Sequence, residues 1–210
     1  MAHIPQSPTT EISVLSFEDA LIPSDTGTYD REKWLYVPDF YSEYRYILGT
    51  RGKNPLIAIG INPSTAEPDN LDNTLKSVER IALGNGCDSF VMFNVYAQRA
   101  TDPDQMEKTF NEALHRENMK AFDYILRLSH EAGNPPKVWA AWGTIIKKRP
   151  YLPACVRDMI GIGQKYGAQW YTCGQRSKNG VHPHHPLYLR KDAKLNEFTD
   201  IDEYLENVGK

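Results

Sequence analysis

The hydrophobic positions between residues 55 and 174 gather in short continuous runs. Four of these runs are long enough for a strand and too short for a buried helix, and they lie at 55–61 (PLIAIGI), 89–97 (SFVMFNVYA), 138–143 (VWAAWG) and 168–174 (AQWYTCG). A run that is apolar at every position predicts a strand covered on both faces, as in a parallel sheet.

Helical periodicity fills the intervals between these runs. Residues 72–83 place apolar side chains three and four positions apart, residues 110–132 form the longest such stretch, and a third helix is expected near 154–166. Strands that alternate with helices predict a parallel sheet with right-handed crossovers. We therefore expect an α/β fold, a three-layer sandwich with a central four-stranded parallel sheet.

The front of the chain has a different character. Residues 1–30 carry several prolines and a Ser-Asp-Thr-Gly turn signal, which is typical of an arm. Residues 34–48 are rich in aromatic side chains and are expected to pack on the domain as a strand or edge segment. We expect an arm and aromatic segment over 1–50 and the α/β domain over 51–210.

Residues that can contact a ligand stand at the carboxyl end of each predicted strand. They are Gly60, Asn62 and Ser64 at the end of the first, Asn94 near the end of the second, Trp142 at the end of the third, and the histidine-rich residues 182–185 in the loop that follows the fourth. Ligands of open parallel sheets bind outside the carboxyl ends of the strands. The sequence thus predicts one pocket of amides, a hydroxyl, an indole and imidazoles, which are groups that bind a flat polar ligand by its hydrogen-bonding edge.

The charge is unevenly distributed along the chain. The total of 24 Lys and Arg against 27 Asp and Glu gives a net charge of −3, which does not favour nucleic acid. Between residues 138 and 191, however, nine basic residues face a single acid, so that this segment carries +8 and the remainder −11. The expected phosphate contacts come from this segment and a neighbouring loop, and they are Arg99, Lys147, Lys148, Arg176, Lys178 and His182.

Several classes of protein lack support in the sequence. No apolar run approaches the length of a membrane span, and the N-terminus has neither the basic nor the apolar region of a secretory signal. The three cysteines are far apart and are expected to be buried, which fits a cytoplasmic protein. No carboxylate lies near the histidines at 182–185, and P-loop and GxGxxG motifs are missing, so we expect no metal and no cofactor.

The motifs at the strand ends resemble those of known families. GINPS at 60–64, FN at 93–94, AWG at 141–143 and HPL at 185–187 resemble, in order and spacing, the motifs of the uracil-DNA glycosylase superfamily. A longer pattern, from NPSTA to HPLY within residues 44–190, resembles the uncharacterised bacterial and phage family called domain of unknown function sixteen forty-three.

The glycosylase resemblance implies a glycosylase-like fold and a role for each matching residue. Asn62 would place the attacking water, Asn94 would read the base edge with Gly60, Ser64 and Trp142 around it, and His185 would stabilise the departing base. His182 with Pro183 is an alternative register for the histidine.

One departure from the glycosylase pattern concerns the water-activating residue. The classical loop carries an aspartate where this chain has Asn62, and an amide orients water but cannot take its proton. Asp69 and Asp72 are the nearest acids, and Asp72 reads equally as the N-cap of the next helix.

These observations predict a DNA glycosylase that hydrolyses the N-glycosidic bond of a modified or mismatched base. Two alternatives stay open: a non-catalytic module that binds nucleic acid or a nucleotide, and an enzyme that acts on free nucleotides.

Overall fold

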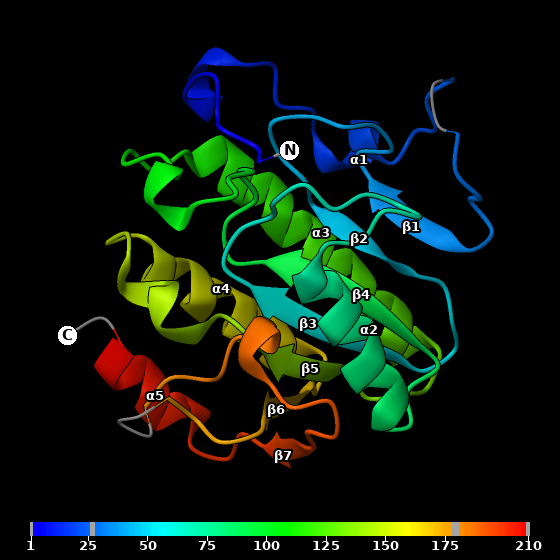
Figure 1. Cartoon of the computed structure of the whole chain (residues 1–210), viewed down its shortest axis with the longest axis vertical. Coiled ribbons are helices and arrows are strands. Elements are labelled where there is room, and N and C mark those ends of the chain that lie inside the picture. Colours follow the sequence, from blue (N-terminus) through cyan, green and yellow to red (C-terminus); the bar gives the residue numbers. More distant parts are fainter. Residues whose placement is uncertain (1, 26–27, 178–180, 209–210) are drawn as a thin grey trace.

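A single sheet forms the centre of the molecule (Figure 1). The computed structural model describes residues 2–25, 28–177 and 181–208. Within them the sheet has seven strands in the order β1-β2-β4-β3-β5-β6-β7. The strands are β1 (Trp34–Val37), β2 (Ile47–Thr50), β3 (Pro55–Gly60), β4 (Ser89–Asn94), β5 (Lys137–Ala140), β6 (Gln169–Cys173) and β7 (Leu195–Glu197).

The four predicted strands are present and form the middle of this sheet. β3 pairs in parallel with β4 on one side and with β5 on the other, and β5 pairs in parallel with β6. The expectation of a four-stranded sheet was nevertheless wrong in number. β1 and β2 extend the sheet beyond β4, β7 extends it beyond β6, and all three run antiparallel to their neighbours.

The hydrophobic pattern does not reveal β1, β2 and β7 as separate strands, and there is a physical reason for this. β7 is the three-residue segment Leu-Asn-Glu, held on β6 by backbone pairing such as Tyr171 opposite Glu197, and its side chains form no apolar run. β1 and β2 lie in the aromatic segment, where the sequence indicated one element and the structure has two.

Helices cover both faces of the sheet (Figure 1). α2 packs on one face, whereas the other four pack on the opposite face. The three expected helices are confirmed with shifts of a few residues, and α1 and α5 were not anticipated. The helices are α1 (Phe17–Ala20), α2 (Asn73–Gly84), α3 (Glu112–Glu131), α4 (Leu152–Lys165) and α5 (Ile201–Val208).

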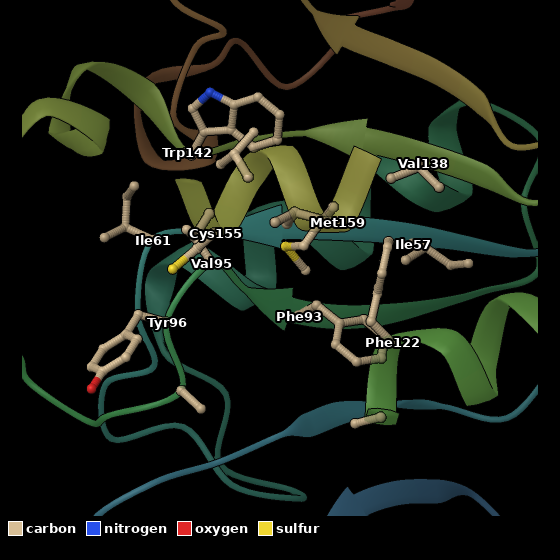
Figure 2. Close-up of a cluster of buried hydrophobic side chains, with 14 of the residues drawn as sticks. Ile57, Ile61, Phe93, Val95, Tyr96, Phe122, Val138, Trp142, Cys155 and Met159 are labelled. Carbon is tan, nitrogen blue, oxygen red and sulfur yellow. The ribbon is translucent and has the colours of Figure 1, made fainter. Parts of the chain in front are cut away.

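Alternation along the central strands divides the core into two layers. Ile57 and Ile59 of β3 point into the larger layer beneath α3 and α4, part of which Figure 2 shows, and Leu56 and Ala58 point toward α2. All four side chains are fully buried, which explains why β3 reads as a continuous apolar run. The three cysteines are free and buried, as expected.

The described residues include no helix that is both long and apolar enough to cross a membrane.

Two glycines test how β2 joins the parallel core. A Cβ at Gly49 would lie 2.3 Å from the main-chain oxygen of Phe90 in β4, whereas a Cβ at Gly161 in α4 would meet nothing within 4 Å. We expect Gly49→Ala to lower the free energy of unfolding by about 1–3 kcal/mol, because backbone must move to admit the methyl group. Gly161→Ala should raise it by about 0.5–1 kcal/mol through helix propensity. Urea denaturation of the two variants measures both changes in the free energy of unfolding. An unchanged free energy of unfolding in Gly49→Ala would contradict the close packing of β2 on β4.

Candidate functional site

The carboxyl ends of the parallel strands open into one cleft of about 1310 Å³. Its walls come from the loop after β3, the end of β4, the loop after β5 and residues 181–188, which we call the His-Pro loop. The cleft is thus where the sequence predicted a pocket. The predicted residues that line it are Gly60, Asn62, Ser64, Asp72, Asn94, Lys147, Arg176, His182 and His185.

Asn94 is the last residue of β4 and lies opposite Gly60 of β3. Its side chain is 1% exposed, and neither Oδ1 nor Nδ2 has a hydrogen-bond partner among the described residues. The main-chain oxygen of Asn94, in contrast, accepts a hydrogen bond of 2.9 Å from Nδ2 of Asn118. The backbone is therefore fixed while the amide is left unpaired against the cleft, and buried amides are seldom unpaired unless a ligand completes them.

Gly60 makes room for this amide. A Cβ at Gly60 would lie 3.2 Å from Oδ1 of Asn94 and 2.6 Å from Cε of Met92. Any side chain at position 60 would therefore press on the amide and narrow the cleft.

Asn62 begins the loop after β3, and its amide group is partly committed. Nδ2 donates to the main-chain oxygens of Ala100 at 2.7 Å and Pro63 at 3.1 Å. Ser64 in the same loop shares a hydrogen bond of 2.9 Å with Oγ1 of Thr101. With its NH₂ group occupied, Asn62 has its Oδ1 available to accept a hydrogen bond from water or from a ligand.

Asp72 is the N-cap of α2. Its Oδ1 accepts a hydrogen bond of 2.9 Å from the main-chain N–H of Leu75, so the capping role considered from the sequence is confirmed. The carboxylate also lines the cleft, and its charge acts to raise the pKa of both Arg45 and His185.

The His-Pro loop is attached to two neighbouring elements. Oγ of Ser77 in α2 donates to the main-chain oxygen of Pro186 at 2.8 Å. Gly143, after β5, has a φ of +64°, and a Cβ there would lie 3.3 Å from Cβ of His185. Glycine at this position therefore relieves backbone strain and lets the loop approach the end of β5.

His185 is a neutral hydrogen-bond donor in this setting. Burial lowers its pKa, the neighbouring His184 lowers it further, and Asp72 opposes both effects. Its Nδ1 accepts a hydrogen bond of 3.3 Å from the main-chain N–H of Leu187, which in the neutral ring places the proton on Nε2. Among the described residues Nε2 has no protein partner, so it can donate to a ligand.

His182 lies deeper and is held by the C-terminal helix. Its Nδ1 lies 3.2 Å from the Tyr204 hydroxyl, which in turn accepts a hydrogen bond of 2.8 Å from Nε1 of Trp142. Burial and the nearby Lys147 lower the pKa of His182. Since His182 is buried and packs edge-on against Tyr204, whereas His185 is partly exposed, the geometry favours His185 over His182 as the histidine that meets a ligand.

Three of the predicted residues do not line the cleft. Trp142 is fully buried in the core, as Figure 2 shows, so its indole is not placed to stack on a bound ring. Arg99 is fully buried, donates to the main-chain oxygens of Ser64 and Ala66 and lies under Tyr41. Lys148 forms an ion pair with Asp104. Lys178 lies outside the described residues.

Four of the nine basic residues of the segment 138–191 are paired with acids from elsewhere in the chain. Arg176 makes a bidentate ion pair with Asp200, one arm of which is 2.7 Å long, and Arg149 donates to main-chain oxygens of residues 104–107. Lys165 and Arg190 are paired with Asp123 and Asp192. Lys147 is the exposed basic residue that lines the cleft without an acidic partner among the described residues. These four pairs offset half of the charge of +8.

Arg45 is a cleft residue that the sequence analysis missed. It precedes β2, lines the cleft and is 1% exposed. The signal that would have indicated it is a charged residue inside the apolar run YRYIL, where full burial of the flanking Tyr44, Tyr46 and Ile47 implies burial of the arginine.

Comparisons with known proteins identify the family. Residues 45–187, about two thirds of the chain, match the family described as "Protein of unknown function (DUF1643)". This chain belongs to that family. The matched region begins at Arg45 and ends in the His-Pro loop, so it contains the cleft-lining residues from Gly60 to His185. No curated protein and no solved structure matches the chain.

His182 and His185, the two histidines of the cleft whose pKa is lowered, generate a prediction about pH. Because the pKa of His182 and that of His185 are lowered in the folded state, the unfolded chain binds protons more readily. Their contribution to stability is complete above the unfolded pKa of about 6.5 and is lost as the pH falls through the lower folded value. We expect the urea midpoint to decrease between pH 7.5 and pH 5.5, and the decrease to shrink in the double variant His182→Gln/His185→Gln. His130→Gln, on the exposed face of α3, is the control, and an equal pH dependence in both variants would contradict the prediction.

Proposed function

We propose that the cleft binds a nucleobase and that the protein hydrolyses an N-glycosidic bond. The observation that carries this proposal is the unpaired, buried amide of Asn94. An amide presents an acceptor beside a donor, which complements the donor and acceptor that lie side by side on the edge of a base. Burial makes the missing hydrogen bonds costly, so a base that supplies both is favoured over one that supplies neither.

The resemblance to the uracil-DNA glycosylase superfamily supports the same function. The residues that carry it, Asn62, Asn94 and His185, come from three separate loops or strand ends and line one cleft. In the resemblance these positions place water, read the base and stabilise the departing base. A reaction on a base within nucleic acid further requires the nucleotide to leave its stack and enter the cleft.

The proposed reaction uses neutral groups. Water held by Oδ1 of Asn62 attacks the anomeric carbon of the sugar, and the bond from this carbon to the base nitrogen breaks with its electron pair on the base. Nε2–H of His185 donates a hydrogen bond to the base and stabilises its negative charge. The water loses a proton to solvent and the base gains one, so that the products are the free base and a sugar with a hydroxyl at the anomeric carbon.

A second candidate function follows from the chemistry of the loop after β3. Asn62 cannot accept the proton of water, and the nearest cleft carboxylate, Asp72, is engaged as the cap of α2. This arrangement favours a module that binds a base without cleaving its glycosidic bond.

Substitution of Asn94 tests base recognition. We expect Asn94→Leu and Asn94→Ala to reduce release of free base by about 100-fold or more, because the developing charge loses its aligned partners. Asn94→Leu should unfold at the same or a higher urea concentration than the native protein, because it removes an unpaired buried amide that costs about 1–3 kcal/mol. Chromatography of free bases after incubation with modified or mismatched oligonucleotides, double- or single-stranded, and with nucleotides measures the first effect. A strong loss of stability in Asn94→Leu would show that the amide is structural.

His185→Ala separates the two candidate functions. If the protein is an enzyme, this variant should still bind the substrate but should cleave the free base from it about 100-fold more slowly than the native protein. Circular dichroism should show that the variant keeps its fold. Leu187→Ala, an exposed position in the same loop, controls for damage to the loop. If the native protein binds a base but releases none from any substrate, catalysis is excluded and the binding module stands.

A further inference from the structure

Arg45 is a buried cation in the wall of the cleft without an acidic partner. Within the part of the chain that the structure describes, its guanidinium makes one hydrogen bond, from Nη1 to the main-chain oxygen of Ala66 at 3.1 Å, and Nε is buried without any. No carboxylate among the described residues lies within ion-pair distance of Arg45. A charge in this position is expensive to bury unless something in the cleft pairs with it.

A second buried guanidinium increases this cost. Nη1 of Arg99 donates to the same oxygen of Ala66 at 3.3 Å, and Arg99 also has no ion pair within the described part of the chain. The two like charges are therefore neighbours. Burial, aided by the charge of Arg99, lowers the pKa of Arg45 to about 9, which still leaves it protonated at neutral pH.

Asp72 also lines the cleft, and it is a carboxylate whose charge acts on Arg45. Its field favours the charged form of Arg45, but the two groups form no ion pair and Oδ1 of Asp72 serves the N-terminus of α2. Arg45 therefore keeps a guanidinium edge that is free to pair with an anionic oxygen from a ligand. Guanidinium pairs with phosphate oxygens in a bidentate manner.

We propose that Arg45 binds the phosphate of a nucleoside monophosphate whose base contacts Asn94. This inference rests on the proposed function and narrows it to a free nucleotide. A cleft of about 1310 Å³ has room for base, sugar and phosphate together.

Two observations favour a mononucleotide over a nucleic-acid strand. Arg45 is buried at the wall, where a terminal phosphate can reach it more easily than a phosphodiester in a continuous chain. Arg176 in the cleft wall is paired with Asp200, and Lys148 beside the cleft is paired with Asp104, which leaves Lys147 as the exposed cation of the cleft without an acidic partner among the described residues. A polyanion binds by neutralising many phosphates, whereas this cleft offers few unpaired cations.

The test compares ligands that differ by one phosphate. Calorimetry measures binding of inorganic phosphate, of the four common 2′-deoxynucleosides and of their 5′-monophosphates to the full chain. At least one monophosphate should bind the native protein roughly 10- to 100-fold more tightly than its nucleoside, and Arg45→Met should remove this difference. Arg45→Lys should keep part of this difference in affinity, because lysine retains the positive charge but lacks the two parallel N–H groups of a guanidinium. Arg190→Gln, which removes an exposed arginine paired with Asp192, is the matched control and should bind as the native protein does.

The stability of Arg45→Met supplies a second test. If Arg45 had a structural role, its replacement would lower the stability of the protein, whereas a ligand-binding role predicts no loss. Arg45→Met replaces an unpaired buried charge with an apolar side chain of similar length, so its urea midpoint should be equal to or above that of the native protein. Inorganic phosphate should raise the melting temperature of the native protein and leave that of Arg45→Met unchanged. A lower midpoint together with unchanged phosphate binding would assign Arg45 to the fold and overturn the proposal.

The remaining outcomes separate this inference from the proposed function. Asn94→Leu should keep its response to inorganic phosphate while it loses discrimination between bases, so each site fails or stands independently. If nucleosides and monophosphates bind equally well, the phosphate site is excluded and the base site stands. If a single-stranded oligonucleotide binds more tightly than every monophosphate, with a steep dependence on salt, the ligand is a strand and the mononucleotide is excluded.

Discussion

Strand β3 lies between β4 and β5, and its parallel pairing with both is the constraint on which the site depends. The pairing places Gly60 opposite Asn94 and brings the chain after β5 to the same edge, so that residues more than a hundred positions apart share one cleft. Parallel strands must be joined by long crossovers, which here are α2, α3 and α4. The burial of β3 on both faces fixes its register, because a slip of one residue would exchange the two core layers.

The cleft holds polar groups that the fold does not satisfy. The amide of Asn94 and the guanidinium of Arg45 are each 1% exposed, and each has polar atoms without a partner. Such groups reduce stability, and they remain in native proteins mainly where function requires them. Other polar groups near the cleft are paired, as in the hydrogen bonds that run from Trp142 through Tyr204 to His182, although Nε of Arg99 and Oδ1 of Asn118 also lack a partner among the described residues.

An element of this fold can be predicted from the sequence to the extent that the interaction which forms it is local. The central strands and the helices between them were predictable because periodicity and full burial leave a strong pattern, and Asp72 was recognisable as a cap from its position before α2. Strand β7 was missed because backbone pairing, and not its side chains, holds it in place. Arg45 was missed because its importance depends on two charges meeting at one carbonyl oxygen, that of Ala66, which no short motif encodes.

The α/β class, the central strands and the order in which polar residues follow them are readable from the amino-acid sequence, because hydrophobic period and strand ends are properties of contiguous residues. Which polar side chains face the cleft depends on how the chain folds. Trp142 turns into the core while Arg45 reaches the wall, and the +8 segment loses part of its excess charge to acids such as Asp104 and Asp200. Burial and charge pairing join residues that are distant in the chain, and a linear reading of residue types carries no information about which of them meet.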